Sequence, residues 1–196
     1  MRSEALALAA LVLARAAPGA VVERILAVVD GRPVLLSEVA VFEKVRGEGE
    51  ARALEGLIDE QLMYREAVRL PQAALSPAEE ERAFQSLRAR LPPASADEED
   101  QLRRLARRQA AILKYVDFRF RPQVRVSEEA VRAAYEKEAA GPEPRPSFEE
   151  AAGALRARLG DEDLTRRIEA WVKELRQGAD VRYNASPPPR AAAGPS

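Results

Sequence analysis

The first patterned segment of the chain, residues 23–39, changes from strand-forming to turn-forming to helix-forming positions. Ile25 to Val29 carries mostly aliphatic, β-branched side chains, and the Asp30-Gly31 pair that follows is a strong signal for a two-residue hairpin turn. Apolar residues return at 34–36, and Ser37 can then cap a helix. The pattern predicts a β-hairpin leading into a helix. Because a lone hairpin is marginally stable in water, we expect it to dock on another part of the chain.

After the hairpin, the apolar positions follow a helical period almost to the end of the chain. A short helix should run from Ser37 to Gly47. The clearest helix covers residues 51–70, where apolar positions recur in steps of three and four until Pro71 stops them. The expected stripe consists of Leu54, Leu57, Ile58, Leu62, Arg65 and Val68, widened by Ala67.

Three later helices begin at a serine that is followed three residues on by glutamate. Ser76, Ser95 and Ser147 each open such a capping box, in which serine and glutamate satisfy each other's backbone amides. The box at Ser95 starts a long helix that should reach about Phe120. The box at Ser147 starts one or two helices that should reach about Arg176.

A change of pattern separates these helices. Residues 118–126 alternate apolar and polar positions and contain Pro122, which predicts an extended connector, and Ser127 starts another helix. Residues 180–183 predict a short closing strand. The fold class is therefore mainly α with a small β-element, and a chain of 196 residues should form one main core.

The two ends of the chain and one internal segment differ in composition from the helices. Ala5 to Ala14 is an apolar run, too short to span a bilayer, and small residues follow as far as Ala20. This pattern predicts a secretory signal peptide cleaved near Ala20; an amphipathic first helix fits less well because the run has no polar face. The sequence thus predicts a signal peptide at 1–20, an N-terminal hairpin and helical core at 21–140, a proline-rich linker at 141–146, C-terminal helices with a strand at 147–184, and a disordered tail at 185–196.

Composition removes most classes of catalytic and metal site. The chain has no cysteine and no histidine, so thiolate chemistry, the commonest general base and the commonest transition-metal ligand are absent. Its 31 basic and 32 acidic residues are mixed along the helices, which disfavours nucleic-acid binding. Acidic pairs such as Asp59-Glu60 are better explained as solvated helix faces. We therefore predict no catalytic residue, no metal site and no cofactor.

Three aromatic residues are the candidates for polypeptide binding. Phe118 and Phe120 flank arginine where the long helix leads into the connector, and exposed apolar residues surrounded by charge are typical of a surface that binds another chain. Packing beneath the connector is the simpler interpretation for each residue alone. Tyr135, on the helix that starts at Ser127, is the third candidate.

The order of these segments resembles that of the SurA-type periplasmic chaperone family, whose members escort unfolded outer-membrane proteins. The similar stretches are Ile25 to Gly31 with Val34 to Val39, Ala53 to Leu62, Leu75 to Glu79, Arg121 to Tyr135, and Ile168 to Tyr183. Together they cover nearly all of the chain after residue 20. The shared order of the stretches carries the resemblance.

The resemblance implies a multi-helix chaperone core in which the C-terminal helix folds back on the N-terminal helices and the end strand lies near the hairpin. Family members commonly contain a parvulin-type prolyl isomerase domain, whose site uses histidines, where this chain has only residues 141–146. Isomerase activity is therefore not expected. The implied function is a non-enzymatic chaperone in the periplasm that binds unfolded outer-membrane or exported proteins in an apolar groove, without stable membrane insertion. A peptidyl-prolyl isomerase and a helical assembly protein with one folded partner are the alternatives.

Overall fold

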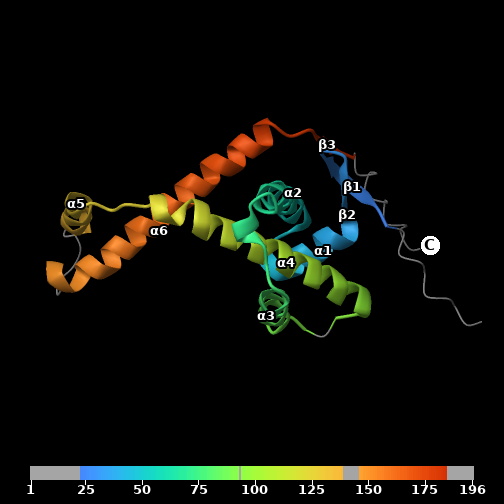
Figure 1. Cartoon of the computed structure of the whole chain (residues 1–196), viewed down its shortest axis with the longest axis horizontal. Helices are drawn as coiled ribbons and strands as arrows, with labels where there is room; N and C mark the ends of the chain where they lie inside the picture. Colours follow the sequence, from blue (N-terminus) through green and yellow to red (C-terminus); the bar gives the residue numbers. More distant parts are fainter. Residues whose placement is uncertain (1–22, 93, 139–145, 185–196) are drawn as a thin grey trace, which may run out of the picture.

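A computed structural model describes residues 23–92, 94–138 and 146–184, and the fold is mainly helical with a small antiparallel sheet, as predicted (Figure 1). The predicted signal peptide, the tail and all of the linker except Pro146 lie outside the described residues. The elements are β1 (Ile25–Val29), β2 (Arg32–Leu35), α1 (Leu36–Arg46), α2 (Glu50–Ala67), a 3₁₀ turn η1 (Pro71–Ala73), α3 (Pro77–Arg88), α4 (Ala96–Arg119), a second 3₁₀ turn η2 (Arg121–Gln123), α5 (Glu128–Glu138), α6 (Phe148–Gln177) and β3 (Val181–Tyr183).

The sheet joins two ends of the sequence in the order β2-β1-β3. Asp30 and Gly31 have φ angles of 47° and 78°, so both lie in the left-handed region that a two-residue hairpin turn requires. On its other edge β1 pairs with β3, with Val29 opposite Val181. The Asp30 carboxylate also accepts a hydrogen bond of 2.8 Å from the backbone amide of Asp180. The hairpin is therefore docked on the end strand, as the resemblance implied.

The start of α1 differs from the prediction, because Ser37 is not its cap. The residue at the cap position is Leu35, and the helix begins at Leu36 directly from β2. The Ser37 hydroxyl instead donates to Glu23 Oε2 at 2.6 Å and accepts from Gln101 at 2.7 Å. Glu23 also accepts from the Ser37 amide at 3.2 Å, so a carboxylate outside the helix satisfies its first turn.

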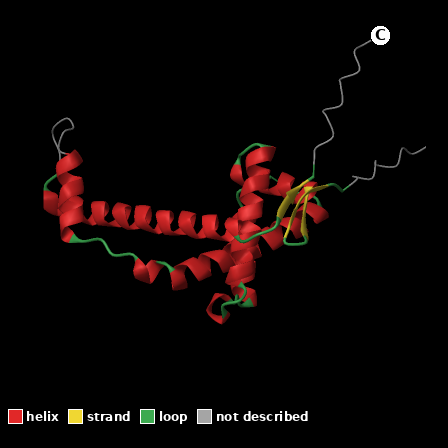
Figure 2. Ribbon diagram, turned by 90° about the horizontal axis from the view of Figure 1, so that it is seen from above, coloured by secondary structure: helices red, strands yellow, loops and turns green. Residues whose placement is uncertain are grey.

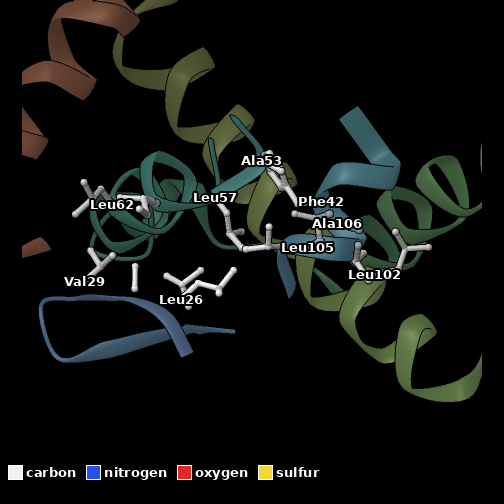
Figure 3. Close-up of a cluster of buried hydrophobic side chains, with 14 of the residues drawn as sticks. Leu26, Val29, Phe42, Ala53, Leu57, Leu62, Leu102, Leu105 and Ala106 are labelled. Atoms are coloured by element: carbon white, nitrogen blue, oxygen red, sulfur yellow. The ribbon is translucent and has the colours of Figure 1, made fainter. Parts of the chain in front are cut away.

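The larger hydrophobic core lies between the sheet and helices α1 to α4. Leu26 and Val29 of β1 face Leu57 and Leu62 of α2 in this core, and Phe42 of α1 lies deeper among the helices (Figure 3). The predicted apolar stripe of α2 is thus largely buried. Val68 is the exception, at 57% exposed, because α2 ends one residue before it.

The helix that starts after Ser95 ends at Arg119, close to the predicted end at about Phe120. The extended connector is shorter than the alternation at 118–126 predicted, because Phe118 lies within α4 and residues 121–123 form η2. The connector leads to α5, which packs across the N-terminal end of α6. These two segments form an arm that projects from helices α1 to α4, which we call the head (Figure 2). Val131 of α5 and Leu155 of α6 are buried in this arm.

The long helix α6 runs from the arm back to the head as one continuous helix (Figures 1 and 2). Trp171 and Leu164 of α6 pack with Val116 of α4 in a second hydrophobic cluster, separate from the larger core. Leu175 packs against both clusters. The larger cluster is therefore the main core, as expected, and the cluster around Trp171 is a small satellite that Leu175 links to it.

Candidate functional site

A cleft opens between helices α1 to α4 on one side and α6 on the other. It encloses about 550 Å³, within the range of about 300–1,000 Å³ that is usual for ligand-binding clefts. Four helices of the head supply one wall, and Ile168 and Val172 of α6 supply the other. The head residues that line it are Phe42, Val45, Arg46, Gly56, Asp59, Glu60, Met63, Leu87, Arg90, Gln109, Ile112, Leu113 and Val116.

The walls of this cleft are largely aliphatic and only partly covered. Leu113 of α4 is 58% exposed, although it lies beside the half-buried Ile112. Met63 on α2 and the α6 pair Ile168 and Val172 are also half-buried. Since Ile168 and Val172 are four residues apart on a helix, they present one continuous apolar stripe to the cleft. The cleft is therefore an apolar surface that remains accessible in the folded chain.

Two anchors hold α6 beside the head. On the arm side, the Trp171 ring stacks on Tyr115, with centroids 4.9 Å apart, and meets Phe120 at 5.3 Å. Toward the sheet, the Arg176 guanidinium donates to Asp59 and, at 2.7 Å, to the Glu55 carboxylate of α2. These bonds raise the pKa of Arg176, so the guanidinium stays charged at every accessible pH. The anchors fix the position of one wall relative to the other.

A buried carboxylate, Glu60, lies on the head side of the cleft, so the solvated helix face predicted for the Asp59-Glu60 pair was wrong for Glu60. Glu60 is only 4% exposed, and its two oxygens accept from Arg108 Nε at 2.9 Å and from Gln109 Nε2 at 3.0 Å. Arg108 also lies 3.6 Å from Glu38 of α1. Burial raises the pKa of Glu60, and its bonds to Arg108 and Gln109 oppose that shift. Because both oxygens are occupied by side chains of α4, Glu60 ties α2 to α4, a structural role.

The three candidates from the sequence do not line this cleft. Phe118 is 52% exposed on α4, whereas Phe120 is half-buried against Trp171. Tyr135 lies in the arm, where its ring packs edge-on against Phe148, with centroids 5.4 Å apart, and its hydroxyl donates to the Pro146 carbonyl at 3.0 Å. The structure therefore brings Phe120 into a packed cluster and leaves Phe118 exposed, and it does not gather the three residues into one surface.

The cleft residues were missed because their exposure depends on where α6 lies. Their sequence signal was an excess of apolar residues beside the main stripes, as at Met63 next to Leu62 and at Leu113 next to Ile112. An amphipathic helix that packs on one side needs only one stripe. A second apolar row beside it indicates a second contact.

No protein-family model and no curated protein matches this sequence. None of the described helices combines the length and the apolar composition needed to cross a bilayer. Among residues 23–92, 94–138 and 146–184, no group of three or more carboxylates is placed to hold a metal ion.

Proposed function

We propose that this protein is a periplasmic chaperone of the SurA type that binds extended segments of unfolded outer-membrane or other exported proteins in the cleft beside α6. The observation that carries the proposal is the incomplete burial of aliphatic side chains on both walls: Leu113 is 58% exposed, and Ile168 and Val172 are half-buried. Contiguous exposed apolar residues with polar surroundings are typical of interaction sites. The sequence resemblance, whose stretches include Ile168 and Val172 on the α6 wall and Gly56, Asp59 and Glu60 on the head wall, supports the same class of protein.

The expected mechanism is reversible burial of apolar client side chains. A client residue that buries ~100 Å² of apolar surface gains about 2.5 kcal/mol at ~25 cal/mol per Å². Ordering the backbone of that residue costs about 1–2 kcal/mol. Because these two quantities nearly cancel, each residue contributes little, and binding is weak per residue, tolerant of sequence and easily reversed. The client enters and leaves by association and dissociation, without nucleotide and without a chemical step.

Suppression of aggregation tests this proposal directly. An unfolded outer-membrane protein is diluted from urea into buffer, and light scattering is followed with and without an equimolar amount of the chain. We expect scattering to fall in the presence of the wild-type chain. We also expect the chain to bind aromatic-rich peptides in a fluorescence anisotropy titration. If there is neither suppression nor peptide binding, the proposal is wrong.

Substitutions at three exposed apolar residues locate the site. Leu113→Asp places a charge on the cleft wall and should weaken suppression, whereas Val68→Asp, at a residue of equal exposure outside the cleft, should not. Phe118→Asp tests the site expected from the sequence and should behave like Val68→Asp. If Phe118→Asp abolishes suppression and Leu113→Asp does not, the binding surface is at the end of α4 and not in the cleft.

The two alternative functions give different results in these experiments. A prolyl isomerase would accelerate a protease-coupled proline-peptide assay, in which we expect only the background rate. A helical assembly protein would co-purify in a fixed ratio with one folded partner. It would not suppress the aggregation of an unrelated unfolded chain.

A further inference from the structure

The charged side chains that line the cleft differ in how many partners they have within the protein. Its two carboxylates are both engaged within the protein: Asp59 accepts from Arg176 on α6, and Glu60 accepts from Arg108 and Gln109 on α4. A bound segment would therefore find their hydrogen-bonding capacity largely occupied. The field of Arg46 also reaches Glu60, although it forms no hydrogen bond with it in the described structure.

The two arginines on the same lining are much less engaged. Arg90, just after α3, is exposed, and within the described residues its guanidinium has no carboxylate at ion-pair distance. Arg46, at the end of α1, has a side chain 56% exposed, and its Nε lies 3.5 Å from Glu48. An arginine side chain carries five N–H donors. The α1 and α3 side of the cleft thus presents two cations with free donors next to Val45 and Leu87.

The α6 side of the cleft has no such excess of positive charge. A shallower hollow shares Asp59, Ile168 and Val172 with the cleft and continues it along α6. Arg176 lines this continuation too, but it is paired with Asp59 and Glu55, which leaves Glu169 and Lys173 as one further charge of each sign. The binding surface is therefore apolar along its length, balanced in charge beside α6, and cationic at Arg46 and Arg90 on the head wall.

From this arrangement we infer that the cleft prefers apolar client segments that carry an acidic side chain, whose carboxylate lies at Arg46 and Arg90. The inference rests on the proposed function and adds a chemical preference to it. An internal aspartate or glutamate is the source of the carboxylate, because an unfolded client has many such side chains and one C-terminus. Exposed ion pairs contribute about 0.2–1 kcal/mol each, so two arginines correspond to about 2- to 30-fold tighter binding.

Three matched peptides test the preference against the full-length chain. Each is labelled, amidated at its C-terminus and identical in its apolar residues, and they differ at one terminal position, which is Glu, Gln or Lys. Fluorescence anisotropy at low salt should give the tightest binding for Glu and the weakest for Lys. Because salt at 1 M screens charges beyond ~3 Å, the differences should shrink there while the Gln peptide stays bound.

Charge reversal identifies the arginines responsible. Arg46→Glu and Arg90→Glu should each reduce the preference for the Glu peptide, and the double variant should prefer Lys. Arg125→Glu is the matched control, since Arg125 is exposed, lies on the connector before α5 and does not line the cleft. It alters net charge equally and should leave the order of affinities unchanged.

Each result bears differently on the two proposals. Equal affinities for the three peptides would overturn the charge preference and leave the chaperone proposal standing. An equal effect of Arg125→Glu and Arg90→Glu would also overturn it, because net charge alone would then explain the order. If no peptide binds and aggregation is not suppressed, both proposals fail.

Discussion

Gly56 should be a position where adding one methyl group destabilises the protein, although glycine in a helix is normally improved by alanine. A Cβ atom built on Gly56 would lie 2.8 Å from Cε1 and 3.2 Å from Cζ of the Phe42 ring. Phe42 is buried in the larger core, so its ring cannot simply swing into solvent. The α1–α2 contact therefore depends on the missing side chain.

The change in the free energy of unfolding expected for Gly56→Ala follows from two opposing effects. Replacing glycine by alanine in a helix interior gains about 1 kcal/mol from backbone propensity. Overpacking a core by one methyl group costs about 1–3 kcal/mol. Gly56→Ala should thus change the free energy of unfolding by between about zero and 2 kcal/mol in the destabilising direction. Gly153→Ala in α6 is the control, because a Cβ there meets nothing within 4 Å, and it should stabilise by about 1 kcal/mol.

Urea unfolding followed by far-ultraviolet circular dichroism measures both variants. For a chain of this length, about 2–4 °C of melting temperature corresponds to 1 kcal/mol, which gives a second readout. Phe42→Leu removes the ring atoms that clash, so Gly56→Ala should be less harmful in that background, with a measurable coupling energy. If Gly56→Ala stabilises as much as Gly153→Ala, the Phe42 ring moves freely, and the reasoning about close α1–α2 packing is refuted.

Three further predictions concern α6 and the long-range ion pairs. Trp171→Ala should lower the free energy of unfolding by about 3–5 kcal/mol, and Trp171→Phe by clearly less, because a phenylalanine ring can still stack on Tyr115. A thermal melt measures both variants, and equal losses of stability would contradict the importance of stacking. Bonding to Lys114 lowers the pKa of Glu79 from 4.5 to about 2. The ionised carboxylate therefore contributes stability above pH 4.5 that should be lost as the pH falls toward 2. Over that window the urea midpoint of Glu79→Gln should fall less than that of the wild-type chain. Ser147→Ala should lower stability by about 0.5–2 kcal/mol, whereas Ser147→Asp should preserve the cap of α6.

The features predicted correctly are those decided by neighbouring residues. Ser76, Ser95 and Ser147 each accept a hydrogen bond from the amide three residues later, and α3, α4 and α6 begin where those capping boxes stand. The hairpin turn at Asp30-Gly31 is local in the same way, because it needs only two residues that tolerate positive φ.

The features that were missed depend on partners far away in the sequence. Ser37 looked like a cap from its neighbours, but Glu23 and Gln101 determine its hydrogen bonds. Phe118 and Phe120 have the same local pattern, and only the position of Trp171 makes one packed and the other exposed. Sequence period identifies an apolar face, and it does not say which other helix covers it.

The pairing of β1 with β3 has a consequence for the order of events during folding. Asn184, just after β3, donates to the carbonyl of Ile25, a contact across 159 residues of sequence. Closing so long a loop carries an entropic cost that local helix contacts do not, so we expect the α1–α4 head to fold before α6 docks. The second wall of the cleft is then completed last, when Trp171 and Arg176 of α6 reach their partners on the head. A chain truncated before α6 should therefore not bind clients in the cleft.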